Sequence, residues 1–147
     1  MYLLDSQVVF DLFSRDRDRR IFQWLDEARP SDKQLFVSVI SLGQIAHAIE
    51  ELSPQERNQW RRLFQEGRRV LEDQGSLIDV DMGIVDVWQS SLRGNRLIEV
   101  PDAEEELGED DRLIIATAIA RNYVLVTPGS PLIQEVAQRT TLATQPL

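Results

Sequence analysis

The sequence predicts an α/β domain of three layers, in which a mostly parallel sheet lies between helices on both faces. Short apolar runs such as Tyr2–Leu4 and Tyr123–Val126 alternate along the chain with amphipathic segments of helical period. Strands without polar alternation are typical of parallel sheets, which are covered on both sides. The length of 147 residues suits one domain, which we expect to span residues 1–147.

Composition narrows the classes of function. The chain carries 25 acidic and 16 basic residues, and its formal charge of −9 argues against stable, non-specific binding of duplex nucleic acid. The chain has no cysteine, which excludes thiolate metal sites and favours a reducing compartment. Neither a signal peptide nor an apolar run long enough to span a bilayer is present. We therefore expect a cytoplasmic protein with no membrane association.

The first third of the chain is predicted to fold as strand, helix, helix and strand. The strand over residues 2–4 ends at Asp5, and a helix follows over Ser6–Phe13. A second helix with one apolar stripe is closed by Pro30. The second strand is expected over Leu35–Val39.

Two helices then form a predicted hairpin that protrudes from the domain. Ser41 is expected to begin the first of them, in a capping box with Gln44. The second is long and begins at Ser53-Pro54, where Glu56 completes another capping box.

The remaining elements continue the alternation of strand and helix. In order, they are a strand over Leu77–Val80, a helix capped by Asp81, a turn at Arg93-Gly94-Asn95, an acidic loop over Pro101–Asp110, a buried helix and strand over Asp111–Thr127, a helix over Pro131–Gln138 and a short strand over Thr141–Ala143.

Polar residues are predicted to gather where the strands end. In a parallel sheet the functional site lies outside the carboxyl ends of the strands. Asp5 ends the first strand, Gln44 follows the second, and Asp111 lies in the first turn of the most apolar helix. Taken singly, each aspartate is explained as a helix cap. Together, at one edge of the sheet, they indicate a shared acidic pocket.

Three segments resemble the PIN domain, and within it the VapC-type and FitB-type toxins of bacterial toxin–antitoxin pairs. They are MYLLDSQVV, VSVISLGQIAHAIEEL and DRLIIATAIARNYVLVT. The resemblance implies an endoribonuclease that depends on Mg²⁺ or Mn²⁺, acts on RNA, forms a homodimer and is held silent by an antitoxin-like protein.

The chain departs from the family pattern at its acidic site. Of the four acids that the resemblance implies, Asp5 and Asp111 match as metal ligands and catalytic residues, whereas Gln44 stands at the position of the second acid. The fourth position falls on Gly129 or Leu132, and neither is acidic. In addition, Gln7 stands where the family has Asn.

The departures predict weak metal binding. Mg²⁺ is usually held by one or two carboxylates together with waters and phosphate, and a neutral amide cannot replace a lost charge. Glu109 or Asp110 is a candidate to compensate, although nothing in the sequence requires it. Replacing Gln44 by Glu and Gly129 by Asp is expected to restore metal affinity.

Three arginines of the long helix, Arg57, Arg61 and Arg68, flank its apolar stripe and are candidates for contacts to RNA phosphates. The alternative is a solvated face whose arginines pair with nearby acids.

Two functions therefore remain open: a toxin endoribonuclease with weakened or lost catalysis, and a non-catalytic PIN module that binds a partner protein. A phosphoacceptor receiver is excluded, because it needs a lysine after its last strand and Lys33 is the only lysine.

Overall fold

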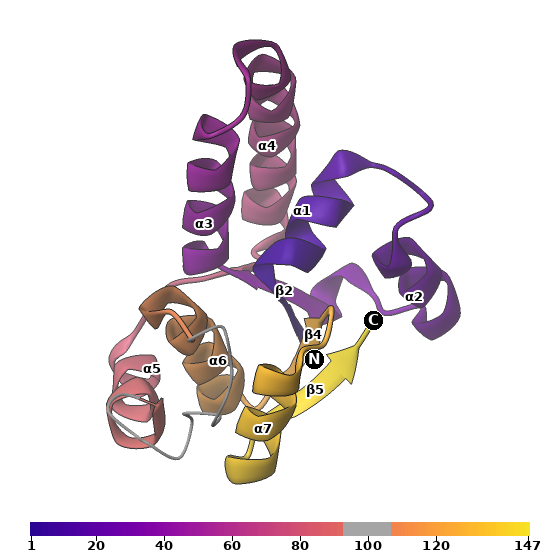
Figure 1. Ribbon diagram of the computed structural model, residues 1–147. Helices are drawn as coiled ribbons and strands as arrows, with labels where there is room; N and C mark the ends of the chain where they lie inside the picture. Colours follow the sequence, from indigo (N-terminus) through magenta and orange to yellow (C-terminus); the bar gives the residue numbers. More distant parts are fainter. Residues whose placement is uncertain (93–106) are drawn as a thin grey trace.

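The computed structural model describes residues 1–92 and 107–147, which form a five-stranded sheet with helices on both faces (Figure 1). The strand order is β3-β2-β1-β4-β5, and each neighbouring pair is parallel. The predicted α/β architecture is thus confirmed. Among the described residues, no helix has the length and apolar character needed to cross a membrane.

Strands and helices alternate as expected. The strands are β1 (Tyr2–Leu4), β2 (Leu35–Ser38), β3 (Leu77–Ile78), β4 (Val124–Thr127) and β5 (Ala143–Pro146). The helices are α1 (Ser6–Ser14), α2 (Arg20–Ala28), α3 (Val39–Glu50), α4 (Pro54–Gln74), α5 (Met82–Val87), α6 (Glu109–Arg121) and α7 (Pro131–Arg139). A 3₁₀ turn, η1 (Asp32–Gln34), precedes β2, and a π-helical turn, η2 (Trp88–Leu92), follows α5.

The central strands bury side chains on both faces of the sheet. Leu4 and Val126 point to the hydrophobic cluster formed with α1, α2, α3 and α4. Leu3 and Leu125 point to a second cluster, formed with α5, α6 and α7. Successive side chains of a strand face opposite sides, so both alternate positions of β1 and β4 must be apolar.

The helices α3 and α4 form the predicted hairpin, which projects beyond the sheet (Figure 1). The long helix α4 begins at Pro54, as predicted, but its capping box is absent. Ser53 makes no cap hydrogen bond to the backbone. Its hydroxyl instead donates to the Glu56 carboxylate at 3.1 Å.

The predicted start of α3 was also wrong. The helix begins at Val39, directly after β2, and its N-cap is Ser38, whose hydroxyl accepts a hydrogen bond from the Ile40 amide at 3.1 Å. Ser41 lies inside the helix and is fully buried, and its hydroxyl has no hydrogen-bond partner among the residues that the structure describes. Ser38 takes the cap because it has the extended backbone conformation that an N-cap requires.

Smaller boundary errors occur elsewhere. The third strand stops at Ile78, and the last strand runs over Ala143–Pro146. Glu109 and Asp110, predicted at the end of the acidic loop, belong to the first turn of α6. The predicted turn at residues 93–95 and the predicted loop over 101–106 lie outside the described residues.

The hairpin packs closely against α1 at a glycine of α4. A Cβ atom added at Gly67 of α4 would overlap the ring of Phe13, whereas one added at Gly43 of α3 would meet no atom within 4 Å. We expect Gly67→Ala to lower the free energy of unfolding by about 1–3 kcal/mol, because the ring must move. The matched control Gly43→Ala should raise it by about 0.5–1 kcal/mol. Urea denaturation measures both, and equal effects of the two substitutions would contradict this packing.

Candidate acidic site

Asp5 is held by both of its carboxylate oxygens at the carboxyl end of β1. As the N-cap of α1 it accepts a hydrogen bond from the Ser6 amide at 2.7 Å. Its second oxygen accepts one from the Thr127 hydroxyl at 3.0 Å. The two residues are neighbours because β1 and β4 are parallel and pair Leu4 with Val126. Asp5 is therefore a helix cap and also a member of the site.

Asp111 reaches the same site from the first turn of α6. A carboxylate at this position faces the positive end of the helix dipole. Its Oδ1 accepts a hydrogen bond from Nε2 of Gln44 on α3 at 3.0 Å. The predicted convergence of Asp5, Gln44 and Asp111 at one edge of the sheet is thus found.

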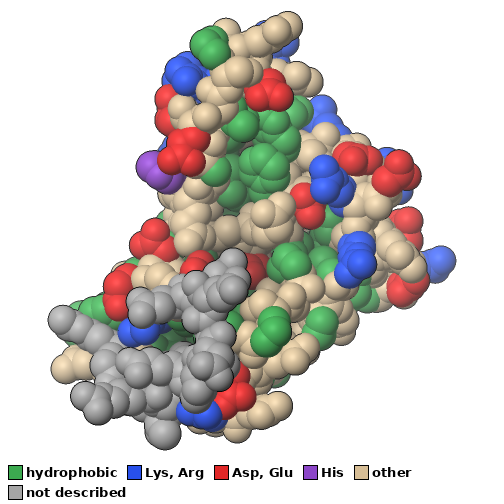
Figure 2. Space-filling model, viewed as in Figure 1, with side chains coloured by type: hydrophobic (Ala, Val, Ile, Leu, Met, Phe, Trp, Pro, Cys, Tyr) green, Lys and Arg blue, Asp and Glu red, His purple; other side chains and the backbone are tan. Residues whose placement is uncertain are grey.

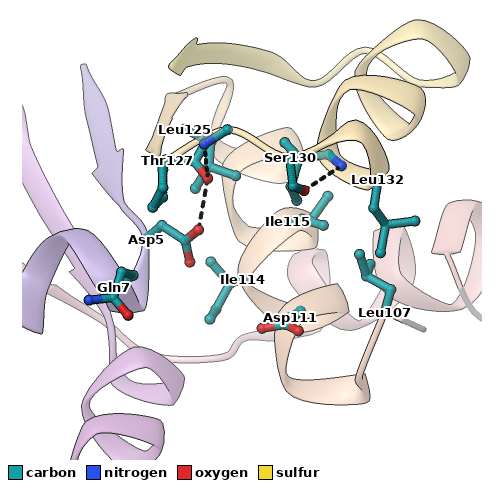
Figure 3. A pocket seen from close by; sticks show the side chains of 13 residues that line it. Asp5, Gln7, Leu107, Asp111, Ile114, Ile115, Leu125, Thr127, Ser130 and Leu132 are labelled. Carbon is teal, nitrogen blue, oxygen red and sulfur yellow. Dashed lines mark hydrogen bonds between the residues drawn. The ribbon is translucent and has the colours of Figure 1, made fainter. Parts of the chain in front are cut away.

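Asp5 and Asp111 line a pocket of about 230 Å³ (Figure 3). In Figure 3 the two carboxylates come from different elements, and Ile114 lies between them in this view. The polar side of the pocket continues to Thr127 and Ser130. The rest of the lining is largely aliphatic and includes Leu107, Ile114, Ile115, Leu132 and Ile133.

Gln44 does not form the capping box predicted with Ser41. Because α3 begins at Val39, Gln44 lies in its second turn, and its side chain reaches Asp111 at the edge of the acidic pocket. Its Oε1 accepts a hydrogen bond from the Ser6 hydroxyl. The side chain thus joins α1, α3 and α6.

The environment of Asp5 disfavours its charge. Burial raises the pKa of the Asp5 carboxyl above its usual value. The hydrogen bonds from Ser6 and Thr127 partly oppose that rise, and the negative charge of Asp111 adds to it. Two carboxylates close together without a cation between them repel each other.

The loop after β4, where a fourth acid is expected, accepts an aspartate better at some positions than at others. Gly129 has φ +82°, so an aspartate there would cost about 1–3 kcal/mol in backbone strain. Ser130 lines the pocket and caps α7, with its hydroxyl accepting from the Ile133 amide at 3.2 Å. Aspartate is an equally good N-cap, so Ser130 is the better host for an added carboxylate.

The acidic turn of α6 does not supply the missing charges. Glu109 accepts hydrogen bonds from Trp88 at 2.9 Å and from Arg112 at 3.4 Å. Neither Glu109 nor Asp110 lines the pocket. Within residues 1–92 and 107–147, no three His, Cys, Asp or Glu side chains are placed to hold a metal ion together. The residues present therefore do not fit one tightly held divalent cation, and they fit a pair of such cations even less.

The three arginines considered for RNA binding already have partners in the chain. Arg61 makes a forked pair with Glu50 at 2.8 and 3.0 Å, and Arg68 pairs with Glu72 at 2.8 Å. Both pairs are exposed, so their exchange for a phosphate costs little. Arg57 donates to the Leu52 carbonyl at 3.1 Å and thereby fastens the hairpin turn. Phosphate binding by these residues stays a prediction.

Two residues of the site were missed. Thr127 and Ser6 orient Asp5 and Gln44, respectively. The signal for Thr127 is a hydroxyl residue at the carboxyl end of one strand beside an acid at the end of its parallel neighbour. Ser6 directly follows that acid in the sequence, but nothing in the sequence indicates its contact with Gln44.

Comparison with known proteins gives one family and a group of solved structures. The family model described as PIN domain matches residues 2–134. No protein of curated function shows a significant sequence match.

Three of the solved structures with similar folds represent this group. FitAcB from Neisseria gonorrhoeae is 17% identical, with a TM-score of 0.71 over 98% of this chain and 96% of that chain. VapBC2 from Rickettsia felis, bound to a DNA fragment from their promoter, is 18% identical, with a TM-score of 0.66 over 99% and 98%. VapBC-5 from Mycobacterium tuberculosis, a member of the VapBC family of toxin–antitoxin systems, is 16% identical, with a TM-score of 0.60 over 99% and 95%. At these identities the likeness shows a shared fold.

The raised pKa of Asp5 gives a stability test. The folded protein holds the proton of the Asp5 carboxyl more tightly than the unfolded chain does. Below the pKa that Asp5 has in the unfolded chain, this group therefore contributes fully to the stability of the fold. That contribution is lost as pH rises through the pKa that Asp5 has in the folded protein. We expect Asp5→Asn, which keeps an acceptor for the Ser6 amide, to melt above the wild type at pH 7 in EDTA. The gain should vanish at low pH.

Asp5→Ala is the matched control for this test, because it removes the charge and the cap together. It should melt below Asp5→Asn at every pH. An Asp5→Asn protein that is less stable than the wild type at pH 7 would contradict the burial argument.

Proposed function

The chain belongs to the PIN domain family, and on that premise we propose that it is a toxin-type PIN protein whose metal-dependent hydrolysis of RNA is weakened or lost. The observation that carries this proposal is the pocket that Asp5 and Asp111 line together, beside which the amide of Gln44 bridges Ser6 and Asp111. The cytoplasm is the compartment that we propose, since a chain without cysteine suits a reducing environment.

The proposal rests on the charge of the site. The resemblance implies four acids, and two are present. A carboxylate added about 4 Å from a bound cation strengthens the attraction for that cation by several kcal/mol, even at an effective dielectric constant near 20. Removing two charges therefore leaves too little attraction to hold a divalent ion tightly. The fold, the pocket and the two aspartates remain, which accounts for the family match without requiring full activity.

RNA cleavage in Mg²⁺ and in Mn²⁺ tests the proposal. We expect wild-type protein to cleave at or near the background rate. The double variant Gln44→Glu/Ser130→Asp should bind Mn²⁺ about tenfold more tightly or better, and its cleavage rate should rise with that affinity. Mn²⁺ affinity is measured by calorimetry and cleavage on a labelled RNA.

Asp5→Asn, alone and added to the double variant, is the control, since it removes one of the two remaining carboxylates. Robust wild-type cleavage that disappears in Asp5→Asn would show that the site is competent as it stands, and the claim of weakened catalysis would fail.

A second candidate function, a non-catalytic module that binds an antitoxin-like partner, is favoured by a separate cavity. It measures about 370 Å³ and lies between α1, α2 and α4. Its lining is largely apolar, with Leu12, Leu25, Leu63 and Val70 among its residues. Val70 is 52% exposed. An apolar groove on a chain of charge −9 suits the apolar face of a basic amphipathic segment. Retained metal binding without cleavage in the double variant would favour this function.

We also propose a homodimer through the apolar surface between the hairpin and α1, where hydrophobic side chains gather in Figure 2. A hollow of about 250 Å³ lies there, with an apolar side of Phe10, Ile45 and Ala48 and a polar side of Ser6, Gln7 and Gln44. The Phe10 ring stacks on Trp60 with the ring centroids 4.1 Å apart. Light scattering should give a dimer for the wild type and a monomer for Ala48→Asp. Ala28→Asp, the same change at an exposed site on α2, should remain dimeric. A monomeric wild type at high concentration would end this claim.

A further inference from the structure

A chain of two side-chain hydrogen bonds crosses the acidic site. The Ser6 hydroxyl donates to Oε1 of Gln44, and Nε2 of Gln44 donates to Oδ1 of Asp111 at 3.0 Å. Ser6 directly follows Asp5, and its amide donates to the Asp5 carboxylate at 2.7 Å. The amide of Gln44 therefore lies between the two segments that carry the aspartates.

The orientation of that amide is fixed by its neighbours. An ionised carboxylate only accepts hydrogen bonds, so the amide nitrogen must face Asp111. A hydroxyl can donate as well as accept, so Ser6 satisfies the amide oxygen on the other side. The opposite orientation would place two acceptors against each other at Asp111.

This orientation is adverse to a metal ion. A divalent cation of the magnesium type requires oxygen ligands, but Gln44 presents its N–H edge to Asp111 and directs its oxygen toward Ser6. Turning the oxygen toward a cation would break both hydrogen bonds.

We propose that Gln44 is a positioning residue that takes the structural place of a cation, so that the acidic site is complete without a divalent metal ion. The amide N–H supplies the partial positive charge that holds Asp111 in place. The inference deepens the proposed function and rests on it for the identity of the site. It differs from a simple loss of charge, because it makes Gln44 a stabilising contact of the metal-free fold.

Thermal melting and Mn²⁺ calorimetry on the full chain test the inference. In EDTA, Gln44→Glu should melt below the wild type, because it places a third carboxylate against Asp111. Millimolar Mn²⁺ should leave the wild-type melting temperature unchanged and raise that of Gln44→Glu. Calorimetry should show Mn²⁺ binding at least about tenfold tighter in Gln44→Glu.

Two further variants separate the causes. Gln44→Met keeps the length of the side chain but makes neither hydrogen bond, so it should melt below the wild type and gain no response to Mn²⁺. Gln134→Glu makes the same change of charge at an exposed position of α7 outside the pocket, and it should change neither measurement.

The inference and the proposed function can fail separately. Wild-type protein that is stabilised by Mn²⁺ as strongly as Gln44→Glu would overturn the inference, whatever the protein does to RNA. A Gln44→Met protein as stable as the wild type would overturn it as well. If Gln44→Met melts below the wild type and only Gln44→Glu responds to Mn²⁺, the inference is supported, and the absence of RNA cleavage by Gln44→Glu/Ser130→Asp would then count against the ribonuclease proposal alone.

Discussion

The parallel pairing of β1 with β4 is the constraint on which the site depends. It places Asp5, directly after β1, level with Thr127, the last residue of β4, so that these two residues, 122 positions apart in the sequence, share a hydrogen bond. The Asp5 amide also donates to the Val126 carbonyl at 2.9 Å, which continues the ladder up to the acid itself. Both strands are buried on both faces, so the register cannot slip without exposing leucine and valine side chains. The position of the carboxylate is therefore set by the core.

The sequence indicated the fold and the meeting of the acids for reasons that the structure makes explicit. Uninterrupted apolar runs such as residues 124–126 are typical of parallel strands that are covered on both faces. The carboxyl ends of parallel strands all lie at one edge of the sheet. Asp5, at the end of the first strand, could therefore be placed near the residues at the ends of the neighbouring strands. These inferences depend on the periodicity of the chain and on topology, which are properties that a sequence displays directly.

The contacts of Gln44 were not foreseeable in the same way. VSVIS contains two serines three residues apart, and each satisfies the composition of an N-cap. Only the backbone conformation at the end of β2 selects Ser38, and that selection moves Gln44 from the helix end to its second turn. The hydrogen bond from Gln44 to Asp111 joins residues 67 positions apart, so no local sequence pattern predicts it. The arginines of α4 are a similar case, because their partners Glu50 and Glu72 are chosen by rotamer and helix packing.

The sheet also acts as a partition between two hydrophobic clusters with no residue in common. Free-energy changes from substitutions that share no partner add nearly independently. Substitutions on the hairpin side, where Gly67 meets Phe13, and on the side of α5, α6 and α7 should therefore have nearly additive effects, except around α3, whose Gln44 hydrogen-bonds to Asp111 and whose Ile40 packs on the second cluster. Asp5 and Asp111 enter the pocket from the boundary between these two compartments, at the end of β1 and the start of α6. A surface that recognises a partner could thus diverge on one side of the sheet while the geometry of the acids is conserved by the strands.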